Sequence, residues 1–132
     1  MCSDTCAQFA NILGGVVIAS EDDLCVVQRL RTIRPTILNR RSRSPLAIAA
    51  LFSFESPDAQ GRTLNLGETV ILQEEINPFI SALRKNDILV TSLHNHWLFD
   101  EPRLMYIHWE SIDEPLDFAM KTLQALKVLK WS

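Results

Sequence analysis

Two strand-like runs joined by a short turn decide the fold of this chain. The first run is Ile88-Leu-Val-Thr-Ser-Leu-His-Asn-His96, and the second is Leu104-Met-Tyr-Ile-His-Trp-Glu110. Both are rich in apolar and β-branched residues, and Phe99-Asp-Glu-Pro102 between them is typical of a turn. The segment therefore predicts two antiparallel strands.

The position of that turn also predicts the register of the pair. A turn centred near residue 100 places His94 opposite Tyr106 and Ser92 opposite His108. A slip of one residue would move His108 to the other face of the sheet. The expected side-chain geometry therefore depends on this register.

Working outward from the hairpin gives a β-α-β-β-α unit. Residues 66–72 predict a strand, and Asn77-Pro78 supplies an N-cap and a first-turn proline for a helix through Arg84. A right-handed crossover makes strand 66–72 parallel to strand 88–96 in one sheet. Asp113-Glu-Pro115 opens a final helix through residue 127.

The N-terminal half is richer in predicted strands. Gly14-Gly15 ends a short helix over residues 6–13, and the segments that follow read as a hairpin (16–19 and 24–27), an extended stretch (29–43), a strand (46–54) and a turn (58–61). The predicted class is α+β: a mixed, mostly antiparallel sheet with an N-terminal β-rich half, then the β-α-β-β-α unit, with helices packed on the sheet. At 132 residues, we expect residues 1–132 to form a single domain.

Composition excludes several classes of protein. With 47% hydrophobic and 22% charged residues, the chain is not disordered, and no apolar run is long enough to span a membrane. The net charge of −3 gives no overall attraction to nucleic acid or to a membrane surface. We expect neither as a partner.

Charge is distributed unevenly along the chain. Residues 24–54 contain no acid and carry six arginines, all within 29–43, whereas residues 100–117 carry six acids against Arg103. The basic stretch suits a solvated or inter-subunit face better than a phosphate or nucleic-acid site, because no aromatic residue interleaves it. Opposite charge on the two segments favours a homodimer.

Three cysteines, Cys2, Cys6 and Cys25, make an odd count without repeated spacing. This pattern predicts free thiols in a reducing compartment. The i,i+4 pair Cys2 and Cys6 is better explained by packing than as half of a metal site. The N-terminus lacks a basic region followed by an apolar stretch, so we expect no signal peptide and a cytoplasmic location.

All three histidines of the chain lie between residues 94 and 108. His94 and His96 are two residues apart on one strand and so share a face, and His108 lies diagonally from His94. Three converging imidazoles match an open metal site, for which Zn²⁺ is the first expectation and Mn²⁺ or Fe²⁺ the next. The alternative is a set of structural histidines, at the surface or in a hydrogen-bonded network.

Other residues complete the predicted site. Glu75 closes the strand before the helix and is expected to be a fourth ligand or a general base, with Glu110 as the other candidate. Glu74 points to the opposite face of the extended chain. Arg103 is expected to receive an anionic group, and Asn95 and Trp97 to contact the ligand beside the histidines.

The predicted function is that of a metal-dependent enzyme, hydrolase or lyase in type, acting on a polar or anionic small molecule. The alternative is a non-catalytic metal- or small-ligand-binding module or sensor with the same pocket. Release of a product separates the two.

The same residues resemble the LppY/LpqO family of bacterial proteins, a domain of unknown function. The resemblance is strongest over residues 67–126. Its motif falls on Glu75, Asn77, Pro78, Ala82, Leu83, His94, Asn95, His96, Pro102, Arg103 and His108. The resemblance implies a bacterial origin and a site around the histidines, and it implies no particular reaction.

Overall fold

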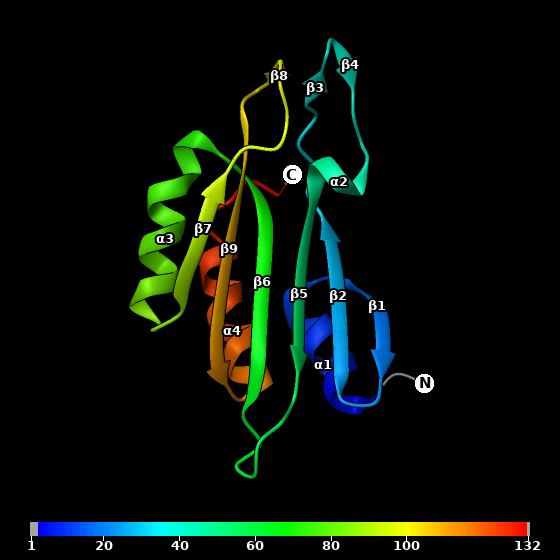
Figure 1. Cartoon of the computed structure of the whole chain (residues 1–132), viewed down its shortest axis with the longest axis vertical. Helices are drawn as coiled ribbons and strands as arrows, with labels where there is room; N and C mark the ends of the chain where they lie inside the picture. Colours follow the sequence, from blue (N-terminus) through cyan, green and yellow to red (C-terminus); the bar gives the residue numbers. More distant parts are fainter. Residues whose placement is uncertain (1–2, 132) are drawn as a thin grey trace.

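A six-stranded sheet organises the chain, and the predicted α+β class is confirmed (Figure 1). The computed structural model describes residues 3–131. Neighbouring strands of the sheet are antiparallel throughout. In their order across the sheet the strands are β1 (Val16–Glu21), β2 (Leu24–Leu30), β5 (Ala49–Glu55), β6 (Thr63–Leu72), β9 (Leu104–Asp113) and β7 (Leu89–His94).

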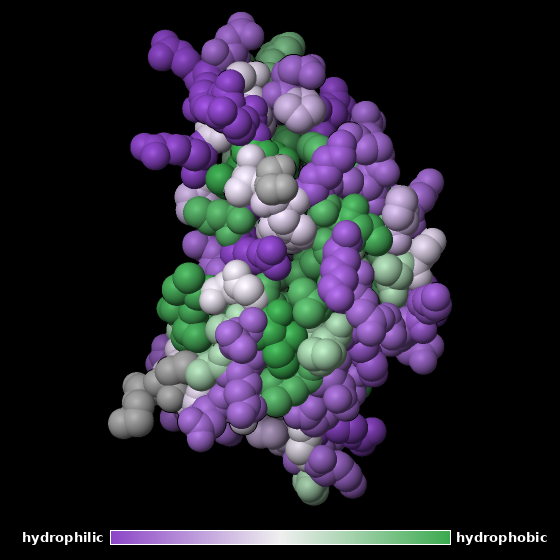
Figure 2. All heavy atoms as spheres, turned by 180° about the vertical axis from the view of Figure 1, so that it is seen from behind, coloured by the Kyte–Doolittle hydropathy of each residue, from purple (hydrophilic) through white to green (hydrophobic). Residues whose placement is uncertain are grey.

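Three helices cover one face of this sheet. They are α1 (Asp4–Leu13), α3 (Ile76–Lys85), which follows the 3-10 turn η1 (Gln73–Glu75), and α4 (Pro115–Leu126). Their apolar side chains form the main core with alternate residues of the strands. Seen from this side, hydrophobic surface shows between hydrophilic side chains (Figure 2). None of the described helices is long and apolar enough to cross a membrane.

The opposite face of the sheet is covered only at one end. There Val70 and Leu72 pack with Leu104 and Tyr106, and a loop residue, Trp97, packs against them. Beyond this end stands a small second sheet of β4 (Arg40–Arg41), β3 (Thr36–Ile37) and β8 (Asp100–Glu101) (Figure 1). The short helix α2 (Pro45–Ile48) lies beside it. The rest of this face is open.

The predicted register of the hairpin is confirmed. Ser92 pairs with His108 and His94 pairs with Tyr106, as the position of the turn implies. Strands β6 and β7 run parallel to one another, but β9 lies between them and pairs with both. Gly67 on β6 leaves room for the Trp109 ring, because a side chain there would collide with the indole.

Several local predictions are wrong. Helix α3 begins at Ile76 with Glu75 at its N-cap, so Asn77 lies inside the first turn rather than at the cap. Strand β7 ends at His94, so His96 lies in the loop after it. The predicted strand over residues 46–54 begins as helix α2, because Ser44 caps that turn and Pro45 occupies its first position.

The prediction of free thiols is also wrong. Cys6 on α1 and Cys25 on β2 form a disulfide with Cα atoms 5.6 Å apart. Cys6 therefore has no thiolate to offer a metal, and Cys2 lies outside the described residues. The odd count misled because one bond needs only two of the three cysteines. The cytoplasmic location stays a prediction, but the disulfide removes the argument from free thiols that supported it.

Candidate functional site

Two histidines approach each other closely where β7 meets β9. The Nε2 atoms of His94 and His108 are 3.1 Å apart, and the two rings are nearly parallel with centroids 5.0 Å apart. The strand register places both on the open face of the sheet. A pair at this distance holds one proton between its nitrogens, because one imidazole must donate and the other accept.

His96 joins the pair from the loop and extends it into a row of rings. Its ring stacks on His94 at 4.7 Å and on Tyr106 at 4.2 Å between centroids. Tyr106 is buried, donates its hydroxyl proton to the carbonyl of Ala47 at 2.8 Å, and accepts a hydrogen bond from Trp97 Nε1 at 2.6 Å. Burial raises the pKa of the Tyr106 phenol, which stays a neutral platform for His96.

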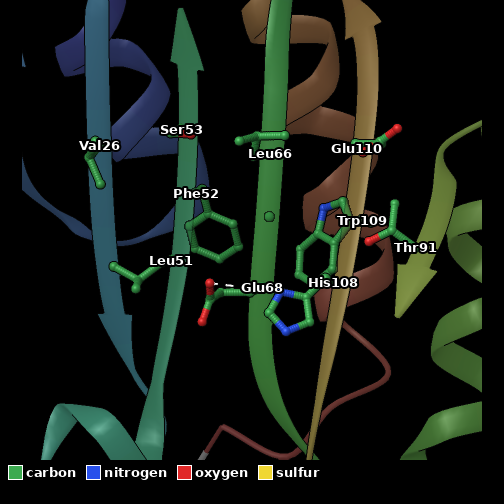
Figure 3. A pocket seen from close by; sticks show the side chains of 11 residues that line it. Val26, Leu51, Phe52, Ser53, Leu66, Glu68, Thr91, His108, Trp109 and Glu110 are labelled. Carbon is green, nitrogen blue, oxygen red and sulfur yellow. Dashed lines mark ion pairs between the residues drawn. The ribbon is translucent and has the colours of Figure 1, made fainter. Parts of the chain in front are cut away.

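Glu68 is a site residue that the sequence reasoning missed. It lies opposite His108 in the β6–β9 register, and its Oε1 is 3.8 Å from His108 Nδ1 (Figure 3). The available signal was alternation along β6, where Leu66, Glu68 and Val70 share the face opposite the main core. A carboxylate at Nδ1 favours the tautomer that carries its proton there, so His108 Nε2 is left as an acceptor.

A groove of about 360 Å³ runs from the contact between Glu68 and His108 across the open face of the sheet (Figure 3). Its charged or titratable lining groups are Glu68, Glu110 and His108, and no lysine or arginine lines it. The remaining lining residues are Val26, Leu51, Phe52, Ser53, Leu66, Gly67, Thr91 and Trp109. The groove is thus apolar at its centre, with Glu68 and His108 at one end and Glu110 at the other (Figure 3).

Glu75, predicted as a ligand or base, is held elsewhere by a buried ion pair. Arg31 donates to both of its carboxylate oxygens, at 2.8 and 2.7 Å. The backbone amides of Leu72 and Lys130 donate to the same oxygens, at 2.9 and 3.0 Å. Burial by itself raises the pKa of Glu75, but these hydrogen bonds lower it by more. All the hydrogen-bonding capacity of the carboxylate is therefore used within the fold.

The structure places the predicted ligand-binding residues apart from one another. The Arg103 side chain is half-exposed, and its Nε lies 3.6 Å from Oδ1 of the buried Asp100 carboxylate. Arg103 does not line the groove. Asn95 is exposed, between His94 at the end of β7 and His96 in the loop. Trp97 packs against Val70, Leu72 and Leu104 and donates to Tyr106, the residue on which His96 stacks.

The family described as "Domain of Unknown Function (DUF1259)" matches residues 7–128. The chain belongs to this family. No curated protein and no solved structure matches the chain. The DUF1259 match covers the histidines, Glu68 and the groove, and its description assigns no reaction. Membership in the LppY/LpqO family stays a prediction, because the matching description does not carry that name.

The predicted three-histidine metal site is not preformed in this DUF1259 chain. Within residues 3–131, no group of three His, Cys, Asp or Glu side chains is placed to hold one ion. Two donors, His94 Nε2 and His108 Nε2, do converge, while His96 is turned to stack on Tyr106. Two of the three predicted ligands therefore meet, and the fourth, Glu75, does not join them.

His96 should titrate below the usual range of a histidine. The side chain is exposed, but partial desolvation beside the neighbouring rings lowers its pKa. The charges of His94 and His108 lower it further, while Glu68 acts in the opposite direction. In the metal-free chain, proton NMR of the ring should give a pKa below about 6.5, the value of an unperturbed histidine. A pKa at or above this value would contradict the arrangement.

The lowered pKa of His96 also makes the stability of the fold depend on pH. The unfolded chain binds the His96 proton more tightly, so stability is complete above about pH 6.5 and is lost as the pH falls through the lowered pKa. His96→Phe keeps a stacked ring and should flatten this part of the pH dependence of the urea midpoint. An unchanged slope in the variant would mean that His96 does not contribute.

Proposed function

We propose that the site binds a divalent metal ion between His94 and His108 and acts on a polar small molecule in the adjoining groove. The observation that carries this proposal is the 3.1 Å separation of the two Nε2 atoms. Two imidazole nitrogens this close fit a shared cation at ordinary ligand distances of about 2.0–2.1 Å for Zn²⁺. Zn²⁺ is the first expectation, followed by Mn²⁺ and Fe²⁺.

Glu68 supports the proposal from the second layer. Histidine ligands of metals usually donate their other ring N–H to a carboxylate or carbonyl, which fixes the tautomer and the ring orientation. Glu68 stands at the Nδ1 side of His108, with Nε2 on the side of His94. At 3.8 Å the contact is electrostatic and too long for a hydrogen bond, and it favours the His108 tautomer that has its lone pair at Nε2.

The chemistry we propose is hydrolysis or elimination on a ligand that lies in the groove. When bound, Zn²⁺ supplies Lewis acidity to a substrate oxygen. His96 is exposed and does not line the groove, but it stacks on His94 and its lowered pKa favours the neutral form. We assign it the acceptance of a proton from a ligand that extends past the groove to the metal. The apolar centre of the groove offers contacts to a non-polar part of the ligand.

A specific observation favours a second candidate, a non-catalytic binding module. Glu75 is held by Arg31, so the carboxylate base first expected at that position is not available for catalysis. Glu68 is the nearest remaining carboxylate, and it faces His108. The same metal and groove would then capture a ligand without turnover.

Metal binding is tested by titrating untagged chain with Zn²⁺ against a chromophoric competitor. We expect one ion per chain. His94→Ala and His108→Ala should each weaken the affinity by about 100-fold or more, and Glu68→Gln by about 10–100-fold. Affinity should also fall below about pH 6.5, because protonated imidazoles do not bind metals.

Glu110→Gln is the matched control for Glu68→Gln. Glu110 is two residues after His108 on β9, so it lies on the same face of the sheet, and it also lines the groove. Its replacement should leave Zn²⁺ affinity unchanged. Equal affinity in the wild type, His94→Ala and His108→Ala would show that the histidines form a structural network instead.

Turnover separates the two candidates once metal binding is established. An activated ester such as p-nitrophenyl acetate is a suitable first probe. An enzyme should hydrolyse it faster in the Zn²⁺-loaded chain than in buffer with Zn²⁺, and His96→Gln should lose that excess while keeping the ion. Full metal occupancy without such turnover would show that the site does not hydrolyse esters, and would favour the non-catalytic binding module.

A further inference from the structure

The uncovered part of the sheet is a broad apolar surface, here called the open face. It consists of the strand residues that point away from the helices, and it includes Val26, Leu51, Leu66 and Ile112. Ile112 is 61% exposed, and Leu66 is 39% exposed. Sheets normally bury an apolar face against a second layer, so this surface is typical of an interface.

The open face is also uniformly acidic. It carries the carboxylates of Glu21, Glu55, Glu68 and Glu110. Within the described strands of the sheet the only lysine or arginine is Arg29, and its side chain turns to the helix side, where it donates to the carbonyl of Leu13. The basic side chains on the open face itself are those of His94 and His108. A partner that covers this face must therefore bring positive charge together with apolar contacts.

The same chain carries a surface of that kind. The small sheet and its flanking loops, residues 34–46 and 98–101, form an arm that projects beyond the end of the main sheet (Figure 1). Its exposed basic residues are Arg34, Arg40, Arg41 and Arg43. Hydrophilic side chains crowd this end of the molecule (Figure 2).

Large apolar side chains are exposed between these arginines. Leu38 is 65% exposed and Phe99 is 77% exposed, and a backbone hydrogen bond from Leu38 to Phe99 holds the two loops together. Leu46 and Leu98 are more than 70% exposed. Of the two carboxylates on the arm, Asp100 is buried and accepts from the Leu104 amide, so the exposed charge of the arm is mainly positive.

We propose that the arm of one copy docks on the open face of a second copy of this chain. Charge complementarity selects this arrangement, because pairing two open faces directly would bring carboxylates against carboxylates. The arm instead places arginines on acids and Leu38 and Phe99 on the aliphatic strand residues. Docking does not require the metal, but the arm covers the groove in which the small molecule is proposed to lie, so dimer formation and ligand binding compete for this surface.

Association should be visible by sedimentation of the full chain at low salt. We expect a concentration-dependent dimer with a dissociation constant of about 10 μM, weakened at least about tenfold near 0.5 M salt, where exposed charges are screened. The charge-reversed arm, Arg40→Glu with Arg41→Glu, should be monomeric. The charge-reversed face, Glu55→Lys with Glu110→Lys, should also be monomeric.

Mixing the two reversed proteins gives the decisive measurement. An acidic arm then meets a basic face and a basic arm meets an acidic face, so both contacts of a reciprocal pair are restored. The mixture should form a heterodimer although neither component associates alone. The control variant Lys85→Glu with Lys127→Glu reverses two exposed charges on the helix side and should dimerise like the wild type.

Three results would overturn the proposal. The first is a wild-type chain that stays monomeric at about 100 μM in low salt, well above the expected dissociation constant. The second is a dimer that both reversed proteins retain, which would place the interface elsewhere. The third is a monomer that binds vesicles of anionic lipid through Arg40 and Arg41, which would make the arm a membrane contact.

Discussion

Glu75→Gln is expected to lower the free energy of unfolding by about 3–5 kcal/mol, the cost of breaking a buried ion pair from one side. Arg31 is fully buried, and its guanidinium would face a neutral amide where it now has a bidentate carboxylate. The amides of Leu72 and Lys130 would also lose an anionic acceptor. Urea unfolding followed by circular dichroism measures the change.

Glu74→Gln is the matched control for this experiment. Glu74 is the neighbouring residue, is largely exposed, and lies 3.9 Å from the exposed Lys130 ammonium, so its replacement should cost no more than about 0.5 kcal/mol. Glu75→Gln that folds with wild-type stability but loses activity would restore the catalytic role first expected for Glu75. Zn²⁺ affinity of the folded Glu75→Gln fraction should be unchanged.

The ion pair also sets an acid limit for the fold. The folded pKa of Glu75 lies below its unfolded value of about 4.3, so its contribution is complete above that pH and is lost as the pH falls through the lowered pKa. Glu75→Gln should remove this part of the acid sensitivity.

Reduction of the disulfide is expected to cost about 3 kcal/mol, because the bond closes a loop with a sequence separation of 19 residues. Both cysteines are buried between α1 and β2, so reduction changes little of the exposed surface. The bond stabilises the fold mainly by restricting the conformations of the unfolded chain. Urea unfolding with and without dithiothreitol measures the difference. Cys6→Ala with Cys25→Ala should unfold near the reduced wild type and show no response to the reductant.

An identical unfolding midpoint in both buffers would contradict this prediction. It would show that the two cysteines contribute to stability through packing alone. Closeness of the two residues in the fold was not readable from their spacing, because Cys6 lies on a helix and Cys25 on a strand.

Sequence patterns predicted the second half of the fold better than the first. The hairpin register followed from apolar alternation and one turn, because both strands have a continuous pattern and pair with each other. The arm was predicted only as an extended stretch. Its strands are two residues long, and β3 pairs with β8 across 60 or more residues. Local periodicity contains no information about such a contact.

The candidate site was predicted in part for the same reason. His94 and His108 meet because both belong to the hairpin that the sequence defines. Glu68 was missed because its position opposite His108 depends on the β6–β9 register, which no short turn sets. Glu75 was misassigned because its partner Arg31 is 44 residues away, so a polar residue at a strand end looked free to act.

The contacts of Arg31 have a further consequence for the kinetics of the fold. They join Arg31 to Glu75, and Arg31 to Lys130 across 99 residues of chain. Contacts between such distant segments require large loops to close, so they form after the more local hairpins. Interactions that are absent from the folding transition state slow unfolding without speeding folding. We therefore expect the buried Arg31–Glu75 pair to form late in folding, so that it slows unfolding more than it speeds folding.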